Sequence, residues 1–386
     1  MKKILVEASR ITLQEAPKSL LDHISVIADP RIEKKCQHKL VDIVAIAICA
    51  IISGADDWNS IEGFGKIKQD WFQGFLDLPN GVPSHDTFRR LFSILSPDEF
   101  RKFFTDWVND IAGLVEGVVA IDGKTLRRSH DKRLGKSAIH MVSAWSVENG
   151  LVLGQIKTEE KSNEITAIPK LLEILDLKGS IVTIDAMGCQ KTIAKKIVEQ
   201  EGDYLLALKG NQGKLADAVK ATFHAATKVN HEGYSVDYYE TTEKSRNRIE
   251  IRRHWTIKCD NKNEQEKMWE GLNIIGMVES ERTIHGKTST ENRYYIGSIE
   301  NNAELFGRSV RHHWGIENSL HWCLDMGFRE DESRIRKGHS AENFAVMRHI
   351  AVNLLKQDKT TKLGVKNKRL KAGWDTDYLV NLLVNA

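Results

Sequence analysis

Residues 118–124 read Val-Val-Ala-Ile-Asp-Gly-Lys, and the rest of the predicted fold is arranged around this stretch. Its first four residues are apolar and three of them are β-branched, which favours an extended chain. A short continuous apolar run predicts a strand that is buried on both faces. We expect Asp122 to lie where this strand leaves the core and Gly123 to let the backbone turn. A carboxylate at the end of a buried strand is unfavourable unless it is paired or binds a cation. Taken alone, Asp122 is more typical of an ordinary turn.

A second copy of the pattern lies at residues 180–186, which read Ser-Ile-Val-Thr-Ile-Asp-Ala. Here too a β-branched run ends in an aspartate, Asp185, and a small residue follows. If the two strands lie side by side in one sheet, Asp122 and Asp185 face each other across its edge. Two such carboxylates repel each other, so the arrangement is favourable mainly around a divalent cation. Ligands that are all oxygen atoms indicate a hard ion such as Mg²⁺ or Mn²⁺.

The charge distribution indicates a polyanionic partner. The net charge of the 386-residue chain is only +3, so the total charge does not identify a nucleic-acid binder. Lysines and arginines nevertheless gather in three clusters, each of which could also be a solvated face. The clusters are Lys124, Arg127, Arg128, Lys132, Arg133 and Lys136; Arg246, Arg248, Arg252 and Arg253; and the basic residues of 356–371.

The cysteines and the apolar runs indicate the cellular compartment. Five widely spaced cysteines include no Cys-x-x-Cys pair, so neither a disulfide framework nor a zinc ribbon is predicted. The N-terminus has too short an apolar run for a signal peptide. The longest apolar run, residues 40–52, carries Asp42 and falls short of the roughly 20 residues that a membrane span needs. We therefore expect a protein of the reducing cytosol without a membrane partner.

The chain divides into four regions of different composition. They are a helical unit at 1–112, the first part of an α/β core at 113–210, a β-rich insertion at 211–305, and helices with a basic C-terminal part that complete the core at 306–386. In the second region the predicted order of elements is β-β-β-α-β-α-β, which is that of an RNase H-like domain. The expected fold class is therefore α/β, with a mixed sheet flanked by helices.

One helix of the N-terminal unit is a candidate DNA contact. Ser84 is a plausible N-cap for a helix over residues 85–95, whose apolar residues fall on one face while Arg89 and Arg90 lie off it. Such a helix could lie in a DNA groove. An ordinary amphipathic helix with solvated arginines explains the pattern about equally well.

Residues 311–322 hold the densest concentration of functional residue types, reading Arg-His-His-Trp-Gly-Ile-Glu-Asn-Ser-Leu-His-Trp. On a regular helix Glu317, His321 and Asp325 share one face, so Glu317 can point at a nearby site. A surface ion pair between Glu317 and His321 is the alternative. Further carboxylates follow closely, and the pattern leaves the third carboxylate of the site open among Glu317, Asp325, Glu330 and Asp331.

Five segments together carry a resemblance to a known family. They read GVPSHDTFRRLF, VVAIDGKTLRRS, TIDAMGCQK, DYLLALKGNQ and HHWGIENSLHWCLDMGFREDESRIR. In this order they resemble the ISAs1 family of bacterial insertion-sequence transposases, which belongs with the IS4-like DDE transposases and includes the H-repeat-associated proteins. The resemblance covers residues 20–383, nearly the whole chain.

The resemblance implies a catalytic triad and an activity. Asp122 and Asp185 match the two aspartates of the family, and Glu317 matches its glutamate. The triad is expected to hold two Mg²⁺ or Mn²⁺ ions. The implied activity is DNA strand cleavage and strand transfer at the ends of a mobile element. The implied partners are double-stranded DNA, as terminal inverted repeats and target, and a second copy of the chain in a DNA-bound homodimer. The implied location is the bacterial cytoplasm, at the nucleoid.

Basic residues near the triad are candidate contacts to DNA phosphates. Lys124, Arg127 and Arg128 follow the first aspartate directly. The wider IS4 signature has Tyr, Arg and Lys around the glutamate, where this chain has Val310, His313 and Leu324. His313 could contact a phosphate when it is protonated, and Arg311 could supply other contacts.

Two other functions remain alternatives. One is a DNA-binding transposase remnant that no longer cleaves DNA, and the other is an RNase H-like nuclease that acts in repair. An ATPase is not predicted, because the Gly-Lys-Thr sequences at 123–125 and 286–288 lack the upstream glycine of a phosphate-binding loop.

Overall fold

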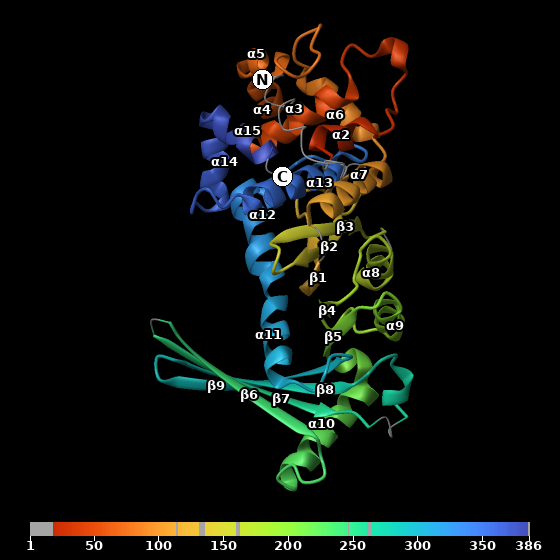
Figure 1. Ribbon diagram of the computed structural model, residues 1–386, viewed down its shortest axis with the longest axis vertical. Coiled ribbons are helices and arrows are strands. Elements are labelled where there is room, and N and C mark those ends of the chain that lie inside the picture. The colour runs from red at the N-terminus through yellow and green to blue at the C-terminus, as the bar shows by residue number, and fades with distance from the viewer. Residues whose placement is uncertain are drawn as a thin grey trace, which may run out of the picture.

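The computed structural model describes residues 18–112, 115–130, 136–159, 163–245, 247–260 and 264–384. Figure 1 shows a helical part at one end of the molecule, a long curved sheet at the other, and a layer of strands and helices between them. A helical rod that begins with α11 (Ala303–His313) runs from the curved sheet to the helical part.

The middle layer is built on five strands. They are β1 (Gly117–Thr125), β2 (His140–Ser146), β3 (Leu151–Lys157), β4 (Ser180–Ile184) and β5 (Asp203–Leu208). Their spatial order is β3-β2-β1-β4-β5, in which β1, β4 and β5 are parallel while β2 is antiparallel to both of its neighbours. The helices α8 (Glu164–Leu172) and α9 (Lys191–Glu199) precede β4 and β5, as parallel neighbours require a crossover. This is the RNase H-like arrangement, and the predicted fold class is confirmed.

The first strand is longer than expected. Asp122 and Gly123 were predicted at a turn, but β1 continues to Thr125 because β2 pairs with it along this whole length, with Asp122 opposite Ser143. Gly123 serves close packing instead of a turn. A Cβ atom at this position would lie 2.1 Å from Oε1 of Glu164 and 2.3 Å from Nε2 of His140.

The insertion extends the core sheet. Its strands are β6 (Val236–Ser245), β7 (Arg248–Lys258), β8 (Ile274–Ile284) and β9 (Lys287–Gly297), which follow a helix, α10 (Gly213–Lys228), that the sequence did not predict. Strand β9 pairs with β5 from Leu205 opposite Gly297 to Leu208 opposite Tyr294, so all nine strands in the described residues form one sheet. The β-rich character was therefore correctly expected, and the insertion is continuous with the core.

Helices from both ends of the chain form the helical part. The N-terminal ones are α2 (Leu20–Ser25), α3 (Leu40–Ile52), α4 (Trp58–Ile67), α5 (Gln69–Gln73), α6 (His85–Ile94) and α7 (Pro97–Ala112); the C-terminal ones are α13 (Ser340–Gln357), α14 (Val365–Trp374) and α15 (Thr376–Val384). Asn353 of α13 exchanges two hydrogen bonds with the backbone of Val152 on β3. Asn343 donates to the carbonyls of Phe92 and Leu95 at the end of α6. Helix α13 thus joins the helical part to the sheet.

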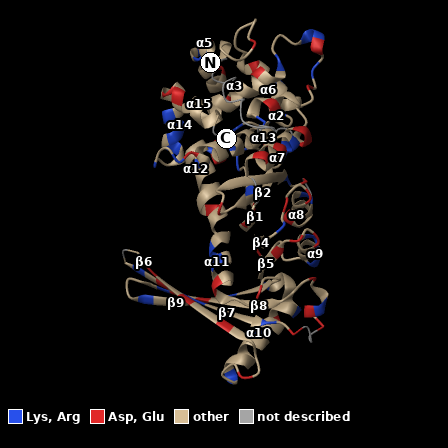
Figure 2. Ribbon diagram, in the orientation of Figure 1, with Lys and Arg blue, Asp and Glu red and all other residues tan. Residues whose placement is uncertain are grey.

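The third basic cluster is only partly a surface feature. Lysines and arginines colour much of α14 in Figure 2. Lys368 is nevertheless buried and donates to the carbonyls of Leu355 and Asp358. Arg369 is buried as well and donates to the carbonyl of Ile51. These two side chains hold the C-terminal helices in place and are not available to DNA.

No helix within the described ranges combines the length and the apolar character that crossing a bilayer requires. The five cysteines, which all lie in these ranges, are free thiols.

Replacing Asp42 with asparagine is expected to stabilise the protein at pH 8 but not at pH 4. Asp42 is 2% exposed in the first turn of α3, and burial raises the pKa of its carboxyl to about 6. The unfolded chain releases this proton near pH 4, so the wild type loses stability as the pH rises from about 4 through 6. The loss amounts to roughly 1–3 kcal/mol. Urea unfolding of the wild type and the variant at the two pH values measures this loss. Equal gains in stability at pH 4 and pH 8 would contradict a raised pKa of Asp42.

Candidate active site

The two aspartates lie at the same edge of the sheet. Strands β1 and β4 are parallel neighbours with Ile121 opposite Ile184, so Asp122 and Asp185 are the next residues in register. The Oδ1 atom of Asp185 accepts hydrogen bonds from the backbone amides of Met187, at 2.9 Å, and Gly188, at 3.4 Å. This turn fixes the Asp185 carboxylate just beyond the end of its strand.

Glu317 lies on a π-helical turn, Ile316–His321, between α11 and α12 (Trp322–Phe328). A regular helix was expected here, with Glu317, His321 and Asp325 at regular spacing on one face. The wider π turn interrupts that spacing, and such turns are frequent at functional sites. Glu317 lines a cavity of about 520 Å³ together with Asp122 and Asp185. The structure therefore brings the three predicted triad carboxylates to one cavity.

The electrostatics of Asp122 are those of a crowded carboxylate. Burial, followed by the negative charges of Glu164, Asp185 and Glu317, raises its pKa to about 7, although the backbone amide of Gly123 acts in the opposite direction. A divalent cation among these carboxylates would relieve the repulsion, so the residues present fit one. Among the described residues no three His, Cys, Asp or Glu side chains are arranged as a ready ligand group.

A family model for the transposase DDE domain matches residues 113–354, which include all three of these carboxylates. The chain belongs to the DDE transposase family. A second model, described as DDE_Tnp_1-associated, matches residues 21–108. The resemblance inferred from the sequence is thereby confirmed at the level of the family.

Relatives of this transposase-family chain cover nearly its full length. The "H repeat-associated putative transposase YhhI" of Escherichia coli K12 is 46% identical over 377 residues, which are 96% of this chain and 98% of that protein. The "Putative transposase YncI" of Escherichia coli O157:H7 is also 46% identical, over 95% of each chain. A cryo-EM structure of the piggyBac transposase synaptic complex with hairpin DNA aligns with a TM-score of 0.44 at 10% identity, over 96% of this chain and 77% of that one.

Glu164 and His140 are neighbours of the triad that the sequence did not predict. Glu164 begins α8, and one of its oxygens lies 2.7 Å from Nε2 of His140. The other ring nitrogen of His140 lies 2.8 Å from the hydroxyl of Thr125. Both groups pack against Gly123, beside Asp122. No local sequence motif marks either residue. A glutamate in the first turn of a capped helix, such as Glu164, is commonplace.

Lys124 has a different environment from the one expected. It was predicted to hold DNA phosphates, but its ammonium lies 2.7 Å from Asp325 and 3.2 Å from both Glu330 and Asp331. Its side chain is only 12% exposed. Since Lys124 is on β1 and Asp325 is on α12, this ion pair ties the helix that follows Glu317 to the strand that carries Asp122. Lys124 is thus a structural clamp of the candidate site.

The other predicted phosphate contacts of the first cluster lie at the surface. Arg127 is 79% exposed in its side chain, with Nε 3.1 Å from Asp331, and Arg128 is exposed. Arg89 and Arg90 lie on α6 beside Asp86. A cavity of about 560 Å³ is lined in part by basic residues, which are Arg89, Lys136, Arg334, Arg336 and Lys337. Three residues of the predicted basic clusters, Lys132, Arg133 and Arg246, lie outside the described residues.

Arg311 and His313 occupy different environments on α11. Arg311 is half exposed and lies 3.0 Å from Glu243 of β6. His313 lines the triad cavity, and its Nδ1 lies 3.1 Å from the hydroxyl of Thr183. Burial lowers the pKa of His313, so a protonated ring that contacts a phosphate, as expected from the sequence, is not favoured at neutral pH.

Proposed function

We propose that this chain is the transposase of a bacterial insertion sequence, and that it cleaves and rejoins DNA strands at the ends of the element with Mg²⁺ or Mn²⁺. The observation that supports the proposal most directly is that Asp122, Asp185 and Glu317, which match the family triad, line one cavity. The two alternative functions are a DNA-binding transposase remnant that no longer cleaves DNA and an RNase H-like nuclease that acts in repair.

The three carboxylates would hold two metal ions. When bound, such ions would activate a water molecule or a 3′-hydroxyl and stabilise the charge on the leaving oxygen. The chain itself positions the ligands. Asp122 is fixed between two paired strands, Asp185 by its turn, and the helix after Glu317 by Lys124. A cation would lower the raised pKa of Asp122 and so favour the ionised form that serves as a ligand.

The DNA partner is proposed on the same basis. Arg90 and Arg127 are more than two thirds exposed and Arg89 and Arg311 about half exposed, and guanidinium groups bind phosphates well. We infer that two copies act together on DNA, because two ends of one element must be brought together before it can move, and that they do so at the bacterial nucleoid.

Wild-type protein with Mg²⁺ is expected to nick a labelled duplex at the boundary between the element end and its flank. The same protein with EDTA is expected to bind the duplex without cutting it. A matched duplex with a scrambled element end controls for specificity. Equal cutting of both duplexes would favour the repair nuclease, whereas binding without cutting under several metal and salt conditions would favour the remnant.

A further inference from the structure

A second cavity, of about 410 Å³, lies between the strands of the insertion and α11. It adjoins the triad cavity, since both are lined by Glu291, Arg293, Tyr295, Val310 and Trp314. The two therefore form one continuous concave surface that leads from the carboxylates onto the curved sheet. The three triad carboxylates do not line the second cavity, so the chemistry proposed for them gives this cavity no role.

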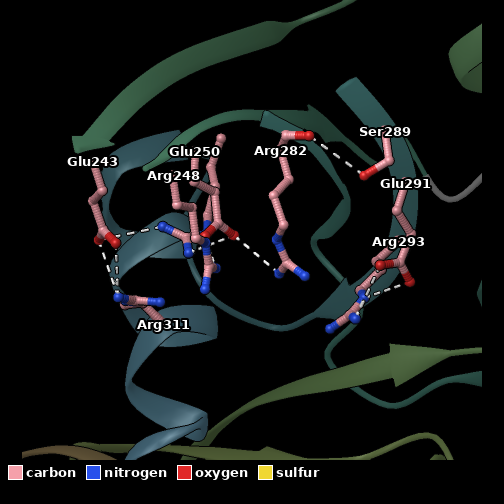
Figure 3. A network of polar contacts seen from close by, with 9 residues as sticks. Glu243, Arg248, Glu250, Arg282, Ser289, Glu291, Arg293 and Arg311 are labelled. Atoms are coloured by element: carbon pink, nitrogen blue, oxygen red, sulfur yellow. Dashed lines mark hydrogen bonds and ion pairs between the residues drawn. The ribbon is translucent and has the colours of Figure 1, made fainter. Parts of the chain in front are cut away.

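Arginines from four elements converge on this second cavity. They are Arg248 and Arg252 of β7, Arg282 of β8, Arg293 of β9 and Arg311 of α11. Figure 3 shows the side chains of the labelled arginines with the carboxylates that they contact. Residues two apart in a strand point to the same face, which places Arg248 and Arg252 together. The neighbouring Arg253 contacts a different set of carboxylates, Glu240, Glu279 and Glu281.

Glu250 is the buried anchor of the cluster. It is 4% exposed, accepts hydrogen bonds from Arg248 and from Arg282, the latter at 3.5 Å, and forms an ion pair with Arg252 at 2.7 Å. Burial alone would raise the pKa of Glu250, but the hydrogen bond from Arg248 and the surrounding positive charges lower it. Glu250 thus faces three guanidinium groups. The cavity as a whole is lined by five arginines and three glutamates, so positive charge is in surplus there.

The remaining carboxylates lie at the rim. Glu243 lies 3.0 Å from Arg311 and 3.2 Å from Arg252, and its side chain is 49% exposed. Glu291 lies 2.9 Å from Nε of Arg293 and is 61% exposed. The pairs of Glu243 with Arg311 and of Glu291 with Arg293 are exposed on both sides. Such pairs contribute little stability, so an incoming anion can replace these two at small cost.

The wall that carries Arg311 is closely packed. A Cβ atom on Gly307 of α11 would lie 3.0 Å from the ring of His254 on β7, and one on Gly276 of β8 would lie 2.5 Å from the ring of Phe306. Helix and sheet therefore approach as closely as two glycines allow. The arginine on the helix and those on the sheet are therefore held at a fixed separation. A site that binds successive charged groups requires such a fixed separation.

We propose that this cavity binds backbone phosphates of the DNA strand that enters the triad cavity, and that these phosphates displace Glu243 and Glu291 from their arginines. The proposal rests on the proposed function, because it takes DNA as the substrate. A guanidinium fork matches a phosphate as well as a carboxylate. Glu250, which is buried, stays in place and keeps the cluster assembled while the rim carboxylates are replaced.

The double variant Glu243→Gln with Glu291→Gln is therefore expected to bind DNA more tightly than the wild type. Arg282→Gln is expected to bind about tenfold more weakly, with a slope of log affinity against log salt that is smaller by about 1. Fluorescence anisotropy of a labelled element-end duplex in EDTA, over a series of salt concentrations, measures both effects without cleavage.

Arg253→Gln is the matched control, because it makes the same charge change on β7, the strand next to the one that carries Arg282, but outside the cavity. The proposal is overturned if Arg282→Gln changes the affinity and the salt slope no more than Arg253→Gln does, or if the double glutamine variant binds no more tightly than the wild type. Circular dichroism melting confirms that each variant is folded. A wild type that binds as expected but never cleaves would count against the proposed catalytic function alone.

Discussion

Replacing Asp185 with asparagine is expected to lower the rate of strand cleavage by more than about 100-fold while DNA binding is retained. Removing a group that merely supports a metal ligand typically costs about 10–100-fold, so the loss of a direct ligand should cost more. Asparagine keeps the oxygen that accepts from the amides of Met187 and Gly188, so the turn after β4 should survive. Single-turnover cleavage with Mg²⁺, together with anisotropy binding in EDTA, separates the two effects.

Asp176→Asn is the control for this substitution. Asp176 is exposed and also accepts a backbone hydrogen bond two residues ahead, from Lys178 at 3.2 Å, but it does not line the triad cavity. It should cleave at the wild-type rate. If Asp185→Asn does so too, the assignment of the second aspartate is wrong.

Replacing Lys124 with methionine is expected to reduce the free energy of unfolding by roughly 3 kcal/mol, because it removes the nearest counter-charge of the buried Glu330 carboxylate. Glu330 is 2% exposed, and among the described residues its remaining ion pair would be the one with Arg348, at 3.5 Å. The helix after Glu317 would also lose its tie to β1. We therefore expect the Mg²⁺ concentration for half-maximal cleavage to rise. Urea unfolding and Mg²⁺ titration of the cleavage rate measure the two consequences.

Lys102→Met provides the comparison for this variant. Lys102 also forms an ion pair, with Asp106 at 2.6 Å, but its side chain is 70% exposed on α7. Exposed pairs of this type contribute little, so both the unfolding and the Mg²⁺ titration should stay close to the wild type. Similar small effects for the two lysines would contradict the role of Lys124 as a clamp.

The core strands and the two aspartates could be predicted because their signals are local. A β-branched run that ends in an aspartate specifies a buried strand and its polar end, and two such runs with a helix between them favour parallel neighbours. The observed register, with Ile121 opposite Ile184, agrees with that pattern. Charge clusters were less informative, because sequence does not show whether a lysine such as Lys368 points outward.

What could not be predicted depends on contacts between distant segments. The continuation of β1 through Gly123 is imposed by pairing with β2, and the partners of Lys124 lie about 200 residues further along the chain. The π turn at Glu317 has no recognised sequence signal here. Pairing of β9 with β5 likewise joins segments about 90 residues apart, so the insertion could be predicted as β-rich without showing that it extends the core sheet.

Cleavage of the labelled element-end duplex by Glu317→Gln is the most decisive measurement, since the sequence pattern left the third carboxylate open. Glu332→Gln is the matched control, because Glu332 pairs with Arg329 outside the triad cavity. With Mg²⁺, Glu317→Gln is expected to bind the duplex but to cleave it more than about 100-fold more slowly, while Glu332→Gln is expected to cleave like the wild type. Cleavage at the wild-type rate by a folded Glu317→Gln variant would contradict the assignment of Glu317 to the triad.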